Sequence, residues 1–248
     1  MNILISIPCY NEAKKLERNI ALLNNYLAKN FKEKYIIEIA DNNSTDNTKE
    51  IAQKIIKYQK NISYRFVKKQ GKGQAIKESW NNATGYDLLA FMDADLATDI
   101  SAFPKMIEKI TKENYDLVYG SRYHKDSNTK RTILRKIISK GYLFLQKIIL
   151  GTSFSDSQCG FKAIRTKAYL KINNKFIKER LSGDKNDMFF DTELLVLTKY
   201  SNLKITDYPV SWKEQKDSSV KLLKYSLLFF RYLFYFRKHL KQIQKKND

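Results

Sequence analysis

Two aspartates that directly follow an apolar run are the residues of this chain best placed to do chemistry. Asp93 and Asp95 come after Leu88–Met92, and a spacing of two residues puts both carboxylates in one short turn. The apolar run predicts a strand buried in a parallel sheet, and ligands of such sheets bind beyond the carboxyl ends of the strands. Carboxylates partly removed from water need a positive partner, and a divalent cation that holds a diphosphate would supply one. Ordinary turn formation is the alternative interpretation of the pair.

Polar side chains also follow the other predicted strands. Strands are predicted over residues 2–8, 35–40 and 62–67, and a segment with apolar residues at helical spacing follows each of them. This alternation predicts an α/β fold with a doubly wound, mostly parallel sheet. The carboxyl ends of parallel strands share one edge of the sheet. The polar residues expected to gather there are Asn11, Glu12, Asp41, Asp46, Lys72, Asp93 and Asp95.

The second half of the chain continues this pattern less regularly. We expect a helix over residues 103–110, a short strand over 117–119, a polar loop over 156–162 and a last strand over 203–212. A further helix opens near Phe189, and Asp191 is placed to cap it or to complement its dipole. A change of composition near Lys216 predicts one domain over residues 1–215 and a basic, aromatic tail over residues 216–248.

Length, charge and cysteine content limit the class of protein. The 248 residues suit one domain with a small appendage. A formal net charge of +20 favours an anionic partner such as nucleic acid, a membrane surface or a phosphorylated substrate, although a lysine-rich composition would explain much of it. Cys9 and Cys159, which lie far apart, predict a reduced cytosolic protein without a zinc site. Neither a secretory leader nor a spanning helix is expected, because the chain opens in a strand pattern and lacks an apolar run of about 20 residues.

Residues 220–240 combine aromatic and aliphatic side chains with lysine and arginine. This composition predicts an amphipathic helix at a membrane surface, where basic side chains extend toward the headgroups and apolar ones are buried. Ile133–Leu150 is a weaker candidate for the same role. A terminal helix packed on the domain, or an oligomer interface, is the alternative. We therefore expect a peripheral protein on the cytoplasmic face of a membrane.

Four segments, taken together, resemble glycosyltransferase family 2, the inverting nucleotide-sugar enzymes with the GT-A fold. They are residues 7–12 (IPCYNE), 41–46 (DNNSTD), 71–75 (GKGQA) and 93–95 (DAD), in that order. Residues 120–123, 156–162, 190–195 and 209–212 look like the polyprenyl-phosphate branch and are similar to dolichyl-phosphate β-glucosyltransferases. The resemblance implies transfer of a hexose to polyprenyl or dolichyl phosphate, with glucose from UDP-glucose as the favoured donor.

The resemblance also implies roles for single residues. The base and ribose of the nucleotide would be held by Pro8, Tyr10, Asn11, Glu12, Asp41 and Asn42. Lys72 would approach the diphosphate, Asp93 would face the ribose, and Asp95 would bind a Mg²⁺ or Mn²⁺ ion that neutralises the departing nucleoside diphosphate. Two departures from the family pattern are Asn42–Asn43, where an aspartate and a glycine are usual, and Ala97, where mannose-transferring relatives often have a glutamine metal ligand.

A lipid phosphate acceptor would already be an oxyanion at neutral pH, because the second pKa of a phosphomonoester is about 6. Direct in-line attack on the anomeric carbon would then depend on positioning and electrostatics more than on a strong base. The arginines expected to hold the acceptor phosphate are Arg122, Arg131 and Arg135, with a solvated helix face as the alternative for the last two. Besides Asp95, the candidate catalytic residues are Asp156 and Asp191, as acid/base or orienting groups.

Three other functions compete with this one. A family 2 enzyme that acts on a sugar hydroxyl, in polysaccharide or glycolipid synthesis, would need a general base, and Asp191 is the candidate. A nucleic-acid-binding module is disfavoured, because the lysines are dispersed and the aspartate-bearing loops would repel phosphate. A nicotinamide dehydrogenase fits less well, since Gly71-Lys72-Gly73 lacks the third glycine of the dinucleotide fingerprint.

Overall fold

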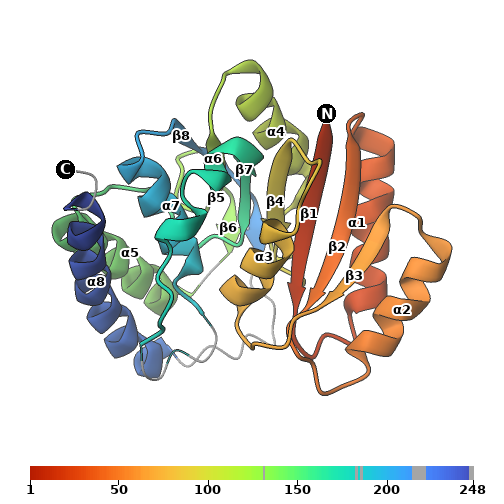
Figure 1. Cartoon of the computed structure of the whole chain (residues 1–248), viewed down its shortest axis with the longest axis horizontal. Coiled ribbons are helices and arrows are strands. Elements are labelled where there is room, and N and C mark those ends of the chain that lie inside the picture. Colours follow the sequence, from red (N-terminus) through yellow and green to blue (C-terminus); the bar gives the residue numbers. More distant parts are fainter. Residues whose placement is uncertain (131, 182–183, 185–186, 214–221, 246–248) are drawn as a thin grey trace.

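A computed structural model describes residues 1–130, 132–181, 184, 187–213 and 222–245. A seven-stranded sheet runs through its centre in the order β3-β2-β1-β4-β7-β5-β8 (Figure 1). The strands are β1 (Asn2–Cys9), β2 (Lys34–Asp41), β3 (Ile62–Phe66), β4 (Leu88–Met92), β5 (Leu117–Ser121), β7 (Phe161–Arg165) and β8 (Ile205–Pro209). A separate two-stranded sheet joins β6 (Thr129–Lys130) to β9 (Trp212–Lys213).

The sheet is mostly parallel, as predicted. β1 pairs in parallel with β2 on one side and with β4 on the other, so the order of strands reverses at β1, where such sheets bind ligands. β7 runs antiparallel to both β4 and β5. The predicted polar loop over residues 156–162 is wrong at its end, because Phe161 and Lys162 begin this strand. Its lysine and arginine interrupt the continuous apolar run that usually indicates a central strand.

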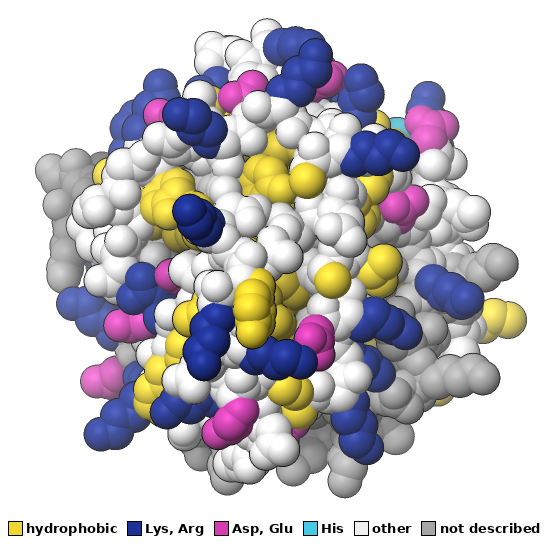
Figure 2. All heavy atoms as spheres, turned by 90° about the vertical axis from the view of Figure 1, so that its right-hand side faces the viewer, with side chains coloured by type: hydrophobic (Ala, Val, Ile, Leu, Met, Phe, Trp, Pro, Cys, Tyr) yellow, Lys and Arg dark blue, Asp and Glu magenta, His cyan; other side chains and the backbone are white. Residues whose placement is uncertain are grey.

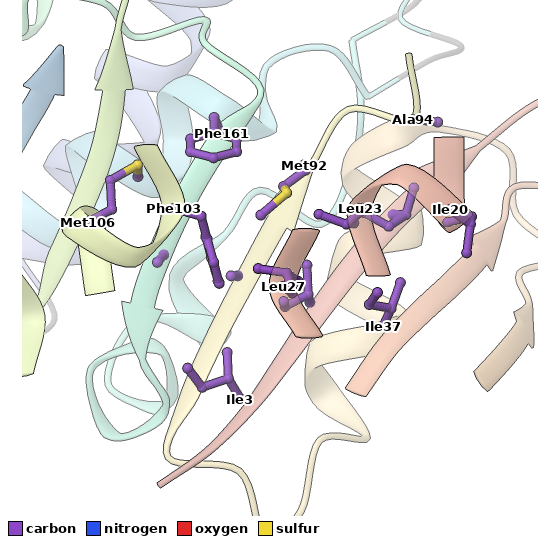
Figure 3. Packing of buried hydrophobic residues seen from close by; sticks show 14 of the residues in the cluster. Ile3, Ile20, Leu23, Leu27, Ile37, Met92, Ala94, Phe103, Met106 and Phe161 are labelled. Carbon is purple, nitrogen blue, oxygen red and sulfur yellow. The ribbon is translucent and has the colours of Figure 1, made fainter. Parts of the chain in front are cut away.

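Helices cover both faces of the sheet. One face is covered by α1 (Leu16–Asn30), α2 (Thr48–Tyr58) and α4 (Phe103–Lys112), with the short helix η1 (Ile100–Ala102) before α4. Ile20, Leu23 and Leu27 lie one helical turn apart on α1 and pack toward Ile37 of β2 (Figure 3). Burial of such side chains supplies most of the driving force for this layer.

The opposite face carries the second core cluster. It is covered by α3 (Lys72–Asn81), α6 (Thr166–Leu170) and α7 (Phe190–Tyr200), and the short helix η2 (Asn173–Lys175) follows α6. α5 (Ile133–Leu150) and α8 (Leu222–Gln244) lie side by side at the end of the molecule farthest from α1 and α2 (Figure 1). Within the described residues, none of the helices is both long enough and apolar enough to cross a membrane.

The C-terminal helix α8 is packed on the domain. Tyr232, Leu233, Phe236 and Leu240 are buried in the second core cluster, which gives α8 an inner apolar face. The predicted boundary near residue 216 lies outside the described residues. Division into residues 1–215 and 216–248 therefore stays a prediction, but the helix within the tail contributes to the core.

A buried carboxyl group ties α8 to α7. The Tyr232 hydroxyl donates a hydrogen bond to the Glu193 carboxyl, which also accepts the Ile177 N–H at 3.2 Å. The Tyr232 ring stacks on Phe189 with 3.6 Å between centroids. Burial, together with the negative charge of Asp187, raises the pKa of Glu193 to about 7. Folding therefore favours the protonated form of this side chain.

Stability should fall with rising pH because of Glu193. The unfolded carboxyl loses its proton near pH 4.3, whereas the folded one keeps it to about pH 7, so the folded state binds more protons in between. Its contribution to the free energy of unfolding should decline from about pH 4 to about pH 7, by at most ~1.4 kcal/mol per pH unit. Urea unfolding at several pH values measures this slope, and Glu193→Gln should flatten it. An unchanged slope in the variant would contradict the assignment.

Candidate active site

The loops after β1 and β2 are joined by hydrogen bonds. The Asn11 carboxamide oxygen accepts the Thr45 N–H at 2.8 Å, and the Asn11 N–H donates to the Ser44 hydroxyl at 3.0 Å. The Glu12 N–H donates to the Thr48 hydroxyl at 2.9 Å. Asn11 has a φ of 56°, a left-handed backbone that asparagine tolerates better than most residues. These contacts bring Asn11 and Glu12, two of the predicted polar residues, against the segment after β2 at one edge of the sheet.

The segment after β2 also contacts the start of α3. Asp41 is buried and accepts hydrogen bonds from the Tyr64 hydroxyl at 2.8 Å and the Ser44 N–H at 2.9 Å. The Asn42 carboxamide oxygen accepts the Gly71 N–H at 2.8 Å, which fixes the turn that opens α3. Asn43 has a φ of 61°, so it occupies the left-handed conformation that glycine adopts most readily. Pro8 is half-buried near the end of β1, and Tyr10 is exposed immediately after it.

Asp93 and Asp95 lie in the turn after β4, next to Glu12. Burial and the negative charge of Asp93 raise the pKa of Asp95, and burial and the charge of Asp95 raise the pKa of Glu12. The chain makes room for Asp93 by omitting a side chain, since a Cβ on Gly160 would lie 1.8 Å from its carboxylate. This edge therefore holds an excess of negative charge at close range.

Lysine side chains enter this acidic edge from two elements. Lys72, the first residue of α3, places its ammonium 2.7 Å from Asp93 and 3.1 Å from Asp191 on α7. Lys162 on β7 pairs with the other oxygen of the Asp191 carboxylate. Burial alone would raise the pKa of Asp191, but the charges of Lys162 and Lys72 outweigh it and lower that pKa. Lys162, Asp191, Lys72 and Asp93 thus form a row of four charges that alternate in sign.

Arg122 and Asp156 form a second buried pair beside these charges. Nε and Nη2 of Arg122 donate to the two Asp156 oxygens at 2.6 and 2.9 Å, and the Arg122 N–H donates at 3.0 Å. Burial opposes ionisation of Asp156, but the charge and hydrogen bonds of Arg122 outweigh it and lower the carboxyl pKa. Much of the guanidinium is therefore engaged by Asp156, which limits its predicted use as an acceptor-phosphate ligand.

A cavity of about 520 Å³ joins the charged edge to the two outer helices. Its polar wall consists of Lys72, Arg122, Asp156, Gln158 and Asp191. Its apolar wall includes Ile138, Tyr142 and Leu145 of α5, and Phe229 and Phe230 of α8. A bound molecule could therefore place a charged group among the first set of residues and an apolar chain along the second.

The structure brings most of the predicted site residues to one edge of the sheet, and it differs from the prediction at a few positions. Capping by Asp191 is wrong, because Phe189 occupies the cap position and the Asp191 carboxylate binds lysines, although it does lie in the first turn of α7. Arg131 and the side chain of Arg135 lie outside the described residues. Lys162 and Gln158 were missed because they stand in what was predicted to be a loop. The alternation of Phe161, Lys162 and Ala163 was the signal for a strand with one inward-facing lysine.

Comparison with known proteins identifies the family. Residues 4–172 match the profile described as Glycosyl transferase family 2. The chain belongs to glycosyltransferase family 2. This membership confirms the predicted resemblance and the predicted class of enzyme, a nucleotide-sugar glycosyltransferase.

Individual relatives agree with the assignment to family 2. The dolichyl-phosphate beta-glucosyltransferase of Saccharomyces cerevisiae is 31% identical over 238 residues, which cover 88% of this chain and 69% of that protein. Glycosyltransferase AglD of Haloferax volcanii is 28% identical over 229 residues, which are 90% of this chain but 35% of AglD, so the chain spans about a third of its length. Glucosyl-3-phosphoglycerate synthase from Mycobacterium tuberculosis, solved with Mn²⁺ and UDP-glucose, superposes with a TM-score of 0.63 at 17% identity, over 95% of this chain and 78% of that one. This superposition confirms the GT-A fold.

The buried pair of Arg122 and Asp156 should be important for stability. Asp156→Ala leaves a buried guanidinium without its counter-charge, and we expect the free energy of unfolding to fall by about 3–5 kcal/mol. Glu108→Ala is a matched control, because Glu108 pairs with Lys105 in solvent and should contribute far less. Chemical denaturation of both variants measures the difference, and equal losses would contradict the prediction.

Proposed function

We propose that this family 2 enzyme transfers a hexose, favoured as glucose from UDP-glucose, to a polyprenyl or dolichyl phosphate. The observation that carries the proposal is the cavity whose charged wall leads into an apolar wall formed by α5 and α8. A lipid phosphate has the same division, with a dianionic head and an apolar chain. The names of relatives such as the yeast dolichyl-phosphate beta-glucosyltransferase support the same acceptor.

The donor would bind across the carboxyl ends of β1, β2 and β4. The segments around Pro8, Tyr10 and Asn11 and around Asp41 and Asn42 meet there and are assigned to the base and ribose. Lys72 is assigned to the diphosphate, because its ammonium lies at the start of α3 beside Asp93. The Lys72 ammonium now pairs with two carboxylates, and a bound diphosphate would offer it a further anionic partner.

The residues present fit a divalent cation. Asp95 is partly buried, with a pKa raised by burial and by Asp93, as expected where a cation is needed to complete the charge balance. Among the described residues, no three His, Cys, Asp or Glu side chains are grouped to hold a metal on their own. Diphosphate oxygens would complete the set of ligands around Asp95, assisted by Asp93. Mg²⁺ or Mn²⁺ would supply charge neutralisation of the leaving nucleoside diphosphate.

The proposed reaction is one displacement with inversion. A phosphate oxygen of the acceptor attacks the anomeric carbon, the bond from that carbon to the donor diphosphate breaks, and the nucleoside diphosphate leaves with the electron pair. No proton needs to be removed, because the acceptor phosphate is already ionised at neutral pH. Lys72 would stabilise the charge on the leaving group. Arg122 would orient the acceptor together with Arg131 and Arg135, whose side chains lie outside the described residues.

The competing acceptor, a sugar hydroxyl, would require a general base. Asp156 and Asp191 are the candidates that line the cavity, and both have pKa values held below the ordinary range by neighbouring cations. A carboxylate with a lowered pKa is a weak base. Its oxygens are also engaged by Arg122 in one case and by two lysines in the other. This chemistry favours an acceptor that arrives ionised.

The predicted contact with a membrane surface would be made by α5 and α8 together. Among the side chains that the structure describes, the exposed large apolar ones of these helices are Ile133, Leu134, Ile137, Phe144, Ile148, Leu227, Phe230 and Phe234. Because the same two helices form the apolar wall of the cavity, an acceptor chain could pass from lipid into the site. We place the protein on the cytoplasmic face of its membrane. Nucleic acid is not a proposed partner, and Figure 2 shows Lys and Arg dispersed over the face formed by α1, α2 and β3, not gathered in one patch.

The function is tested by offering nucleotide sugars with polyprenyl phosphate and a divalent cation. We expect a charged glycolipid to form from a hexose donor, with UDP-glucose as the best substrate. Thin-layer chromatography and mass spectrometry identify the product. Transfer to sugar hydroxyls without use of polyprenyl phosphate would favour the competing acceptor class and contradict the proposal.

Asp95 should be required for this transfer. Asp95→Asn removes the charge assigned to the metal, and kcat/KM should fall at least about 100-fold, even at saturating Mg²⁺ or Mn²⁺. Asp99→Asn is a matched control, because the Asp99 carboxylate is exposed and accepts the Ser101 N–H at 2.9 Å. Steady-state kinetics compare the two variants. Full turnover by Asp95→Asn would rule out the assigned role.

Membrane contact is tested by flotation with vesicles of phosphatidylcholine and phosphatidylglycerol. Phe144→Ser combined with Ile148→Ser removes two exposed apolar side chains from α5 and should lower binding at least about tenfold. Leu22→Ser combined with Tyr58→Ser is the control, because these side chains are comparably exposed on α1 and α2. The assigned surface would be contradicted if the two double variants lost vesicle binding equally, or if neither of them lost it.

A further inference from the structure

Lys162 occupies a position where an apolar residue would be expected. It lies in β7, inside the sheet, in register with Phe91 of β4 and Tyr119 of β5. Its neighbours Phe161 and Ala163 pack in the first core cluster, so Lys162 points to the opposite face, toward α3 and α7. Its side chain is 0% exposed. A fully buried lysine is costly unless its charge is compensated, so its partners define its role.

Asp191 is the partner that compensates Lys162. The ammonium of Lys162 donates to one carboxylate oxygen of Asp191 and to the Cys159 carbonyl. The other Asp191 oxygen accepts from Lys72 at 3.1 Å. Both ammonium groups lie over the Phe91 ring, Lys72 at 5.2 Å and Lys162 at 5.4 Å from its centroid. Asp191 is thus held between a lysine inside the sheet and a lysine at the edge where the donor would bind.

The two lysines differ in how far they can move. Lys162 is enclosed on a central strand, whereas Lys72 lines the cavity and its side chain is 29% exposed. Lys72 also contacts Asp93 at 2.7 Å, so it is shared between two carboxylates. An anionic ligand can recruit Lys72 only if Asp191 keeps a counter-charge after Lys72 turns away, because an uncompensated buried carboxylate is strongly unfavourable.

We infer that Lys162 is a positioning residue that carries the counter-charge of Asp191, so that Lys72 is available to the diphosphate of the nucleotide sugar. The inference rests on the proposed function, because it takes a diphosphate to be the ligand of Lys72. It adds a role for a side chain that does not line the cavity and would not touch either substrate. Without Lys162, Lys72 would remain with Asp191, and donor binding would have to break that buried pair.

The test is Lys162→Met, which keeps the length of the side chain and removes its charge. Asp191 would still pair with Lys72, so the variant should fold, but its affinity for a nucleoside diphosphate should fall about tenfold or more. The probes are UDP, GDP, ADP and CDP, each with Mn²⁺, measured by isothermal titration calorimetry. The diphosphate that binds the wild-type protein most tightly is then used for all variants.

Two further variants separate this role from a structural one. Lys162→Arg retains the charge and should bind the nucleoside diphosphate within about threefold of wild type. Lys162→Met combined with Asp191→Asn removes both charges of the pair, frees Lys72 from Asp191, and should restore affinity to within about threefold of wild type. A merely structural lysine would not be rescued by removal of its partner's charge.

The outcomes distinguish the inference from the function on which it rests. Wild-type protein that binds no nucleoside diphosphate would overturn the proposed function and the inference with it. Wild-type binding with unchanged affinity in Lys162→Met, or without rescue in the double variant, would overturn the inference alone. If Lys162→Met does not fold, Lys162→Gln is measured in its place, and the same tenfold loss of affinity for the nucleoside diphosphate is expected. Failure of both to fold would make Lys162 structural and would also overturn the inference.

Discussion

The site depends on a row of paired charges that runs from the buried Lys162 on a central strand to the partly exposed Asp93 at the edge of the sheet. Lys162, Asp191, Lys72 and Asp93 alternate in sign, so each charge has an opposite neighbour within direct contact. Arg122 and Asp156 repeat the arrangement as a separate pair. Charges buried in this way add little to net stability compared with apolar side chains, but removal of one partner is costly. The ion pairs therefore fix the positions of these charged side chains. A charged substrate can bind one of them only by replacing its present partner.

The first turn of α7 connects these charges to the rest of the molecule. Asp191 contacts α3 and β7, Thr192 shares hydrogen bonds with Tyr142 of α5 and with Gln158, and Glu193 accepts the Tyr232 hydroxyl of α8. Consecutive polar residues are thus held by different elements. The helices that form the apolar wall of the cavity are anchored beside the carboxylate that holds Lys72. The position of α7 therefore determines both where Lys72 lies, at the proposed donor end of the site, and where α5 and α8 lie, at the proposed acceptor end.

The sequence was sufficient for the fold and for the gathering of polar residues at one edge of the sheet, because both depend on local patterns. Apolar runs that end in Asn11, Asp41 and Asp93 follow parallel strands, and parallel strands bring their carboxyl ends together. It was insufficient where pairing is non-local. β7 carries a lysine where a central strand is normally apolar, and the need for that lysine appears only when α7 brings Asp191 against it. The partner of Asp156 likewise comes from 34 residues earlier in the chain.

The electrostatics that stabilise this arrangement also limit the chemistry it supports. Each carboxylate that could act as a base in the cavity is bound to a cation, and the same contact that keeps it charged in the interior makes it a weaker base. An enzyme that deprotonates a sugar hydroxyl needs a carboxylate whose pKa is raised toward neutrality, which burial without a cation would give. Glu193 has such a raised pKa, but its carboxyl is enclosed between α7 and α8 and bonded to Tyr232. The two carboxylates that line the cavity, Asp156 and Asp191, are thus weak bases and Glu193 is enclosed, a combination suited to an acceptor that is ionised before it binds.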